Sequence, residues 1–492
     1  MSVRERKIYS LGFYIFAIYN LGNGVRLRCL GPMNRLFVFG LLVVCFLAAS
    51  SCGTRDQDVI QPPETSSWNT FLGSGDTDVG CAAVADDNGN VYVAGYSYAS
   101  WGSPIAAYTE FNDTFVAKLN KNGNLVWSTF LGPTGTSGGH GCSIAIDGQG
   151  DIYVTGLSTE NWGSPINPYV YGYDTFVAKL SSSGELIWNT FLNSNDSGYD
   201  GGIAVNSKGD IFVIGASFLS WGTPVRPFAG PPDVFVAKLN NSGHLAWNTF
   251  LGSDSFGDDG HGVTADSSGN VYAVGNSSFS WGSPIMPISS PGSYDGFVAK
   301  LDGNGHLLWN TFLGTDGGAE DYAEDVVSDD IGAVYVVGTS KGGSWGSPVR
   351  PYDYYDAFVA KLSGTGTLVW NTFLGSSDWE EARDLTLDSQ GHIFVAGTSY
   401  GGWGPGAAGF VGYTDAFLAE LDRNGNLLAN AFRGSPDMDD GTGLSVDAAG
   451  RIFLVGSSWE TWGQPVRPFA GPGPENASNK TDVFVARLES LR

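Results

Sequence analysis

Residues 309–313 read Trp-Asn-Thr-Phe-Leu, and this five-residue string returns, in identical or closely related form, along most of the chain. Copies begin at Trp68, Trp127, Trp188, Trp247, Trp309 and Trp370, and a degenerate copy begins at Ala429. Neighbouring copies are 59 to 62 residues apart. A repeat of this length indicates one supersecondary unit that is stacked several times.

Two further strings follow the same period. A Trp-Gly pair occurs at Trp101, Trp162, Trp221, Trp281, Trp345, Trp403 and Trp462. An Asp-x-Phe-(Val/Leu)-Ala string begins at Asp113, Asp174, Asp233, Asp295, Asp356, Asp415 and Asp482. Three independent markers therefore each count seven units.

Each unit is predicted to contain four short antiparallel strands. In the second unit these are residues 143–146, 152–155, 175–180 and 186–192, joined by glycine-containing turns and one long loop. Seven such units indicate an all-β protein, a single seven-bladed β-propeller over residues 67–492. The first copy, 68–72, precedes the first full unit, and the last unit lacks a fourth strand after 483–488. We therefore expect the N-terminal strand to complete the last blade, which removes an exposed edge.

The repeats resemble those of the seven-bladed β-propeller (SBBP-type) repeat family of bacterial surface and secreted proteins. The motifs that carry the resemblance are Trp-Asn-Thr-Phe-Leu-Gly, the strand Gly89–Gly95 (Gly-Asn-Val-Tyr-Val-Ala-Gly) and Asp-x-Phe-Val-Ala-Lys-Leu. The match covers residues 67–490. It implies the propeller fold and says little about activity.

The N-terminal region is predicted to contain an export signal. Residues 33–51 have a basic start, an apolar run and small residues before Cys52, and this layout is typical of a secretory signal. A cysteine at this point resembles a bacterial lipoprotein signal, which implies a lipid on Cys52, although Ala49 stands where Leu is usual. A plain signal peptide and an uncleaved membrane helix are the alternatives. Residues 1–32 read as an upstream extension from a misassigned start, and 52–66 as a flexible tether.

Charge excludes one class of partner. Six of the 25 basic and one of the 50 acidic residues precede residue 52, so the remainder carries a net charge of −30. Such a surface repels phosphate backbones, and we expect no nucleic-acid binding. We expect a monomer anchored at the outer membrane or cell surface.

Recurrent residues are poor candidates for catalysis. Residues 338–342 and 397–401 match G-x-S-x-G, but no helix follows, and the serine recurs in every unit. We interpret it as a clamp that hydrogen-bonds the aspartate at the start of the third strand. Asp-rich hairpin turns lack the spacing of a calcium loop and are interpreted as turn chemistry. The five histidines show no zinc-binding spacing.

Positions that differ between units are more informative. Five residues before each first turn, where the inner strand should enter the central channel, stand Cys81, Cys142, Gly201, His261, Glu324, Arg383 and Thr442. Three residues earlier, five of seven units carry an acid: Asp78, Asp258, Asp321, Glu380 and Asp439. We expect these five to form an acidic collar at the channel mouth that could bind a cation such as Ca²⁺ or a basic group, or simply be solvated. A disulfide between Cys81 and Cys142 is left open.

The long loops of the same face carry aromatic residues that could contact a partner: Tyr96, Tyr98, Tyr108, Tyr169, Tyr171, Tyr173, Tyr352, Tyr354, Tyr355, Phe410 and Tyr413. The recurrent Trp-Gly pairs are expected to be structural.

The leading interpretation is a membrane-anchored module that binds a protein or glycan through this face. The alternatives are a propeller hydrolase or lyase with its site at the channel mouth, or a purely structural envelope protein. No catalytic residue or cofactor is assigned.

Overall fold

The computed structural model describes residues 7–11, 14–20, 25–32, 67–109, 111–133, 139–194, 201–471, 480–489 and 491, with backbone only for the three N-terminal ranges and for 139–142. The chain forms two separate units, Met1–Pro63 and Glu64–Arg492. In the first, β1 (Lys7–Leu11), β2 (Tyr14–Asn20) and β3 (Val25–Pro32) make an antiparallel sheet. The expected signal peptide and tether, with Cys52, lie outside the described residues. Among the described residues, no helix is long and apolar enough to cross a bilayer.

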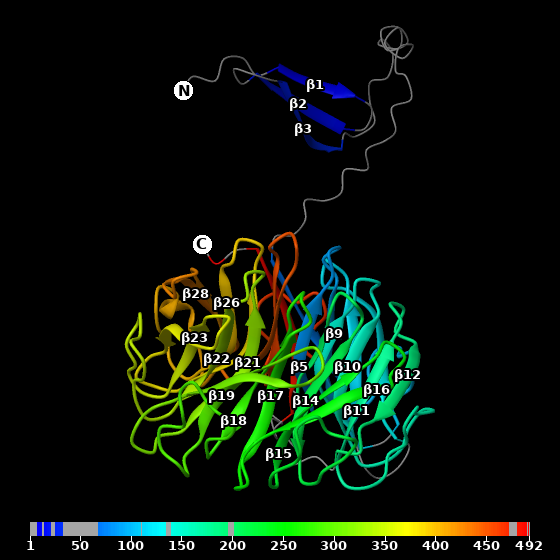
Figure 1. Cartoon of the computed structure of the whole chain (residues 1–492). Helices are drawn as coiled ribbons and strands as arrows, with labels where there is room; N and C mark the ends of the chain where they lie inside the picture. The colour runs from blue at the N-terminus through cyan, green and yellow to red at the C-terminus, as the bar shows by residue number, and fades with distance from the viewer. Residues whose placement is uncertain are drawn as a thin grey trace. The chain divides into compact units, whose positions relative to one another are not determined.

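The second unit is a ring of seven four-stranded antiparallel blades, as predicted (Figure 1). We call the strands of a blade a to d from the axis outward. Blade 1 has β5 (Asp78–Ala85), β6 (Val91–Ser97), β7 (Asp113–Leu119) and β8 (Leu125–Leu131). Blade 2 has β9 (Gly139–Ile146), β10 (Ile152–Ser158), β11 (Asp174–Leu180) and β12 (Leu186–Phe191). Blade 3 has β13 (Ile203–Val205), β14 (Ile211–Ser217), β15 (Asp233–Leu239) and β16 (Leu245–Leu251). Blade 4 has β17 (Asp258–Ala265), β18 (Val271–Ser277), β19 (Asp295–Leu301) and β20 (Leu307–Leu313).

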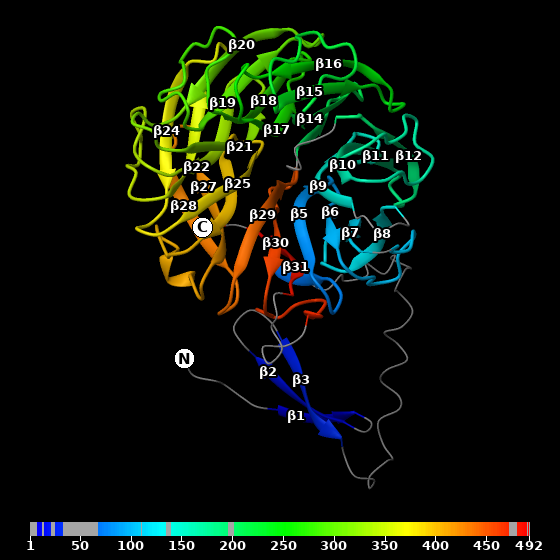
Figure 2. The ribbon, with the colours of Figure 1, turned by 90° about the horizontal axis from the view of Figure 1, so that it is seen from below.

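The remaining blades follow the same order. Blade 5 has β21 (Asp321–Ser328), β22 (Val334–Ser340), β23 (Asp356–Leu362) and β24 (Leu368–Leu374). Blade 6 has β25 (Glu380–Leu387), β26 (Ile393–Ser399), β27 (Asp415–Leu421) and β28 (Leu427–Arg433), with a short 3₁₀ turn, η1 (Ala407–Gly409), before β27. Blade 7 has β29 (Asp439–Val446), β30 (Ile452–Ser458), β31 (Asp482–Leu488) and β4 (Trp68–Leu72). In the view along the ring, the a strands surround the axis and the d strands lie at the rim (Figure 2).

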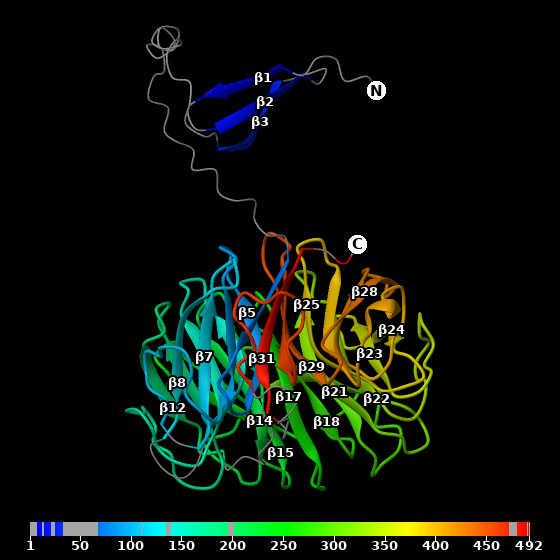
Figure 3. The ribbon, with the colours of Figure 1, turned by 180° about the vertical axis from the view of Figure 1, so that it is seen from behind.

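Blade 7 closes the ring by joining the two ends of the propeller. β4 pairs with β31 so that Arg487 lies opposite Trp68 and Val483 opposite Leu72. Figure 3 shows β31, in red, beside the blue strands with which the propeller begins. This confirms the predicted closure. The side chains of β4 are buried, and Phe71 is 0% exposed. β4, the first strand of the propeller, is therefore part of the folded blade 7.

The hydrophobic core is divided among the seams between blades. One cluster joins Trp68 and Val485 of blade 7 to Val93 and Phe115 of blade 1, and the other six clusters are built in the same way. A d-strand tryptophan seals six of the seven seams at the rim. Trp68 Nε1 donates to the Lys121 carbonyl in the next blade's c–d turn at 2.9 Å.

Glycine in that c–d turn makes room for the indole. Gly123 has a φ of 78°, and a Cβ on it would lie 2.7 Å from the Trp68 ring. Five other d-strand tryptophans meet the next blade in the same way. Blade 7 has no c–d turn, because its c and d strands come from opposite ends of the propeller. No such turn can receive an indole from blade 6, and this accounts for Ala429 in place of the seventh tryptophan.

The b–c loops protect the outer edges. Ile105 N donates to the Ser128 carbonyl at 2.8 Å, and Phe130 N donates to the Ala106 carbonyl at 3.1 Å. The loop therefore covers hydrogen-bonding groups of the d strand that would otherwise form an open edge. Six of the seven Trp-Gly tryptophans of these loops are buried and Trp462 is half-buried, as expected of structural residues.

Closure by β4 gives a direct prediction. Phe71→Ala should lower the free energy of unfolding by about 3–5 kcal/mol, the usual cost of truncating a buried phenylalanine. The equivalent change in blade 1, Phe130→Ala, is the matched control and should cost a similar amount. Chemical denaturation of both variants measures this. A silent Phe71→Ala beside a destabilising Phe130→Ala would contradict the closure.

Candidate functional site at the channel mouth

The channel along the ring axis contains a cavity of about 1200 Å³. Its wall is made by the a strands of all seven blades. At one end it is flanked by Tyr294, which precedes a c strand, by Lys341 and Tyr400, which follow b strands, and by Tyr322 near the start of an a strand. This end of the cavity, which we call the mouth, therefore lies on the face of the d–a and b–c loops.

A β-bulge in the a strand presents one residue of a blade to the channel. The register of β21 with β22 shifts between Ala323 and Asp325, so Glu324 has no partner across the ladder. Arg383 and Thr442 occupy the same bulge position in blades 6 and 7. Bulges redirect a side chain without breaking the sheet. They explain why residues five before the turn line the cavity.

The last residue of the repeated Val-x-Val-x-Gly motif, a glycine within the b strand, makes the bulge possible. At Gly338 of β22 a Cβ would collide with the Tyr322 carbonyl oxygen, and at Gly397 of β26 it would collide with that of Glu381. An alanine there would force the two strands apart. The recurrence of this glycine is thus the signal in the sequence from which the bulge could have been predicted.

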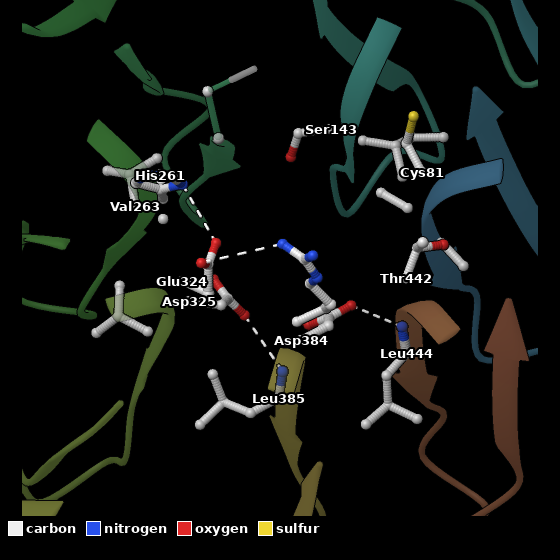
Figure 4. Close-up of a pocket in the computed structure, with 18 of the residues that line it drawn as sticks. Cys81, Ser143, His261, Val263, Glu324, Asp325, Asp384, Leu385, Thr442 and Leu444 are labelled. Atoms are coloured by element: carbon white, nitrogen blue, oxygen red, sulfur yellow. Dashed lines mark hydrogen bonds and ion pairs between the residues drawn. The ribbon is translucent and has the colours of Figure 1, made fainter. Parts of the chain in front are cut away.

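Glu324 connects three neighbouring blades at the mouth. Its Oε2 lies 3.2 Å from His261 Nδ1 in blade 4, and its Oε1 lies 4.0 Å from Arg383 Nη1 in blade 6 (Figure 4). Burial would raise the pKa of Glu324, but the charges of His261 and Arg383 and the hydrogen bond from His261 lower it to about 2. Glu324 is therefore ionised at physiological pH.

Asn276 holds the imidazole of His261 in one tautomer. Its Oδ1 accepts the Ala323 N–H at 2.9 Å, so its Nδ2 donor faces His261 Nε2 at 3.0 Å. Nε2 must then accept, and Nδ1 carries the proton toward Glu324. Burial opposes a second proton, whereas the charge of Glu324 raises the pKa of His261. Because Asn276 already donates to Nε2, the geometry favours the neutral form.

Arg383 extends the cluster into the cavity. Its side chain is 44% exposed, and it also contacts Glu381 in the same strand. Asp259 and Asp440 line the cavity nearby. Burial raises the pKa of both carboxyls, while His261 lowers that of Asp259 and Arg383 lowers that of Asp440. We call His261, Glu324 and Arg383 the charged triplet.

The opposite wall of the channel is made of small residues. Cys81, Gly201 and Thr442 line it, and Thr442 Oγ1 donates to the Gly80 carbonyl at 2.7 Å. The side chain of Cys142 lies outside the described residues, so the disulfide with Cys81 stays an open prediction. One side of the channel is thus charged and the other small and weakly polar.

A carboxyl pair that the sequence did not single out lies beside the triplet. Asp325 and Asp384 line the cavity in blades 5 and 6 and hydrogen-bond to each other. Burial raises the pKa of Asp325 to about 6, and burial together with the charge of Asp325 raises the pKa of Asp384 well above its usual range. Their outer oxygens accept the N–H groups of Leu385 (3.4 Å) and Leu444 (2.6 Å) in the next blade. The pair therefore links adjacent inner strands.

The five acids expected to form the collar are placed differently. Asp78, Asp258, Asp321, Glu380 and Asp439 are at most 1% exposed and lie inside the blades. Each accepts the hydroxyl of the serine that ends the b strand, as Ser97 Oγ donates to Asp78 Oδ1. The serine clamp exists, but its partner is the a-strand acid. The predicted partner, the c-strand aspartate, instead accepts loop N–H groups, as Asp113 does from Thr109 at 2.6 Å.

A line of aromatic rings leads from the loop face to the cavity. Tyr354 and Tyr355 have ring centroids 4.4 Å apart, Tyr355 and Trp379 5.0 Å, and Trp379 and Tyr400 5.8 Å. We call these four residues the aromatic track. Tyr354, Trp379 and Tyr400 are 42–49% exposed, and Tyr400 also lines the cavity.

Backbone hydrogen bonds hold the track in place. Tyr400 N donates to the Trp379 carbonyl and Glu380 N donates to that of Tyr355, each at 2.8 Å. Three loops are thereby fixed together. The sequence indicated Tyr354 and Tyr355, whereas Trp379 and Tyr400 were missed because nothing local marks a turn residue as part of a track.

Several other loop aromatics are structural. Tyr108, Tyr169, Tyr352 and Phe410 each pack edge-on against the d-strand phenylalanine of their own blade. A second aromatic pair lies at the mouth, where Tyr294 and Tyr322 stack with centroids 5.9 Å apart and Lys341 Nζ lies 4.5 Å above the Tyr322 ring.

No protein-family model matches the chain, and no curated protein sequence matches it. Among solved structures it is similar to a puromycin hydrolase, with a TM-score of 0.44 and 14% identity over 78% of this chain and 51% of that one. It spans about half the length of that hydrolase.

Two further structures are similar in the same way. A gluconolactonase from Xanthomonas campestris gives a TM-score of 0.29 and 13% identity over 68% of this chain and 95% of that one. An α-L-arabinanase from Penicillium chrysogenum gives 0.39 and 11% identity over 71% and 93%. These likenesses concern the propeller fold alone, which many unrelated activities share.

The buried acids make stability depend on pH. Burial raises the pKa of Asp78 to about 6 and the pKa of Asp258, Glu380, Asp439 and Asp482 to about 7. The folded state therefore holds more protons than the unfolded chain between about pH 4 and pH 7, and stability should fall as the pH rises through this window.

Thermal unfolding in EDTA at pH 5 and pH 8 measures this effect. We expect a melting temperature several degrees lower at pH 8. Equal melting temperatures, or a more stable protein at pH 8, would contradict the raised pKa values.

Proposed function

We propose that this propeller binds a glycan at its channel mouth. The observation that carries the proposal is the aromatic track, which is exposed, held by backbone hydrogen bonds and continuous with the polar cavity through Tyr400. Sugar rings stack on aromatic faces through their C–H groups, and their hydroxyls bond to charged and amide side chains. The track offers the first kind of contact, and Arg383 and Glu381 offer the second.

Charge favours a neutral or cationic glycan. Asp259, Glu381 and Asp440 face the cavity beside a triplet whose own charges largely cancel. The chain as a whole is strongly acidic, with a formal charge of −25. A polyanionic ligand would be repelled at long range and at the mouth.

Binding accounts for the site better than catalysis. A general base needs a free acceptor atom within reach of its proton. His261 Nε2 is already engaged by Asn276, and the two oxygens of Glu324 are directed at His261 and Arg383. Asp325 and Asp384 contact each other directly, whereas the two carboxyls of a glycosidase stand roughly 5–9.5 Å apart.

The second candidate is a hydrolase or lyase, and Asp325 and Asp384 favour it. Two carboxyls that share a proton in a cavity can act as acid and base. Their bonds to Leu385 N and Leu444 N supply a structural role that accounts for them equally well.

Glycan binding can be tested with neutral tetrasaccharides of different linkage, namely chitotetraose, cellotetraose and maltotetraose. Calorimetry should detect binding of at least one by the full chain. Trp379→Ala should weaken it by about tenfold or more, since loss of a central aromatic contact costs ~2 kcal/mol or more. Arg383→Ala should also weaken it.

Tyr171→Ala is the matched control, because Tyr171 is equally exposed (48%) but lies in a blade 2 loop away from the track. Its binding should be unchanged. Failure of all three sugars to bind at millimolar concentration, or equal binding by Trp379→Ala, would contradict the proposal. Release of new reducing ends that is lost in Asp384→Asn would favour the second candidate.

We further propose that the protein is an SBBP-type envelope lipoprotein with its lipid on Cys52. The layout of residues 33–52 and the three sevenfold strings support this. In a bacterial host, Cys52→Ser should move the protein from the membrane fraction to the soluble exported fraction and abolish incorporation of labelled palmitate. Continued membrane association of the variant would point instead to an uncleaved anchor.

A further inference from the structure

Buried carboxyls from neighbouring blades meet in pairs on the loop face. The c-strand aspartate of one blade and the a-strand acid of the next approach the glycine that follows the d strand. A Cβ on Gly434 would lie 2.6 Å from Asp415 Oδ1 and 2.8 Å from Asp439 Oδ2. Glycine is thus required where the two side chains converge. Asp233 with Asp258, Asp356 with Glu380, and Asp482 with Asp78 form equivalent pairs.

Three of these pairs have a guanidinium as counter-charge. Arg226 donates to the carbonyls of Phe250 (2.8 Å) and Gly252 (3.0 Å), and its charge lowers the pKa of Asp233. Arg350 and Arg467 make the same pair of bonds in the seams after blades 5 and 7. Each guanidinium also stacks on the Trp-Gly tryptophan of the next blade.

The seam between blades 6 and 7 has the pair without the guanidinium. Counted from the Trp-Gly tryptophan, the residue that corresponds to Arg226 is Ala408. Arg433, next to this seam glycine, donates Nη1 to the Phe432 carbonyl at 2.7 Å, but among the described residues it makes no bond to the Gly434 carbonyl. In the seam after blade 4, which also lacks an arginine, Ser289 Oγ hydrogen-bonds both oxygens of Asp295. Between blades 6 and 7, Asp439 Oδ2 accepts the Ser435 N–H (2.6 Å) and hydroxyl (2.7 Å), but Asp415 has neither form of compensation.

Asp415, like Asp233, Asp356 and Asp482 in the seams that contain an arginine, has an oxygen that no described residue satisfies. The residue is 0% exposed, its Oδ2 accepts the Val411 N–H at 2.8 Å, and its Oδ1 accepts nothing from the described chain. Oδ1 is the oxygen that converges with Asp439 Oδ2 beside Gly434. A buried carboxylate oxygen without a partner costs free energy, and a second carboxylate beside it adds repulsion. A cation would relieve both.

We infer that Asp415 and Asp439 bind a hard divalent cation of the Ca²⁺ class in the seam between blades 6 and 7, in the role that arginine fills in three other seams. Calcium takes six to eight oxygen ligands and accepts carbonyls and water beside carboxylates. Among the described residues no three His, Cys, Asp or Glu side chains surround one point. The Gly434 carbonyl, counterpart of the arginine-bound Gly252 carbonyl, and water would complete the shell.

This inference does not depend on glycan binding and is tested with calcium chloride alone. The EDTA-treated full chain should bind one Ca²⁺ by calorimetry, with a Kd of about 10⁻⁴–10⁻³ M as in extracellular modules, and its melting temperature should rise with calcium. Asp415→Asn, which keeps the Val411 bond, should weaken binding at least tenfold and lose the shift.

Two matched variants in the seam between blades 3 and 4 complete the test. Asp233→Asn should bind one Ca²⁺ as the unmodified chain does, because Arg226 already compensates that pair. Arg226→Ala should expose an equivalent pair and raise the stoichiometry toward two. Absence of binding by the unmodified chain, unchanged binding by Asp415→Asn, or equal loss in Asp233→Asn would each overturn the inference.

Discussion

The pairing of β4 with β31 is the constraint on which the rest of the propeller depends. Each blade buries its apolar faces only against its two neighbours, so no blade has a complete core until the ring is closed. Closure between strands from opposite ends of the propeller also makes one seam unlike the other six. Blade 7 lacks a c–d turn, so blade 6 carries Ala429 where its counterparts carry a sealing tryptophan. The loss of this tryptophan from blade 6 is thus a consequence of closure and not decay of the repeat.

Within the closed ring, fixed and variable positions have separate roles. The clamp between the a-strand acid and the b-strand serine holds the loop-face end of a blade, and the c–d glycine with the tryptophan of the preceding blade holds the rim. The bulge residue of the a strand takes no part in either. It is here that blades 4, 5 and 6 place His261, Glu324 and Arg383, and the charged wall of the channel arises from three adjacent blades of an otherwise symmetrical ring.

Much of the fold could be predicted from the sequence, because the copies of the repeat can be aligned and their equivalent positions compared. Period, blade number, closure and the identity of the channel-lining positions followed from counting residues. The a strand of blade 2 was expected to begin at Ser143, but it begins at Gly139. The alternation of apolar and polar residues ends at the bulge, whereas the strand continues beyond it. Burial of Asp78 and its counterparts was missed, because acids at the start of a strand look solvated unless their serine partner, 19 residues away, is known. The pairing of Asp325 with Asp384 and the packing of Trp379 against Tyr355 were also missed. These contacts join different blades or loops, and no local sequence pattern encodes them.

The bulge also determines where substitutions leave the strand pairing of a blade unchanged. Because its residue has no partner across the ladder, replacing it leaves the strand pairing of its own blade intact. Six of the seven blades carry such a bulge around the axis. The side chains that face the channel can therefore be exchanged one blade at a time, by single substitutions that leave the strand pairing of the ring unchanged.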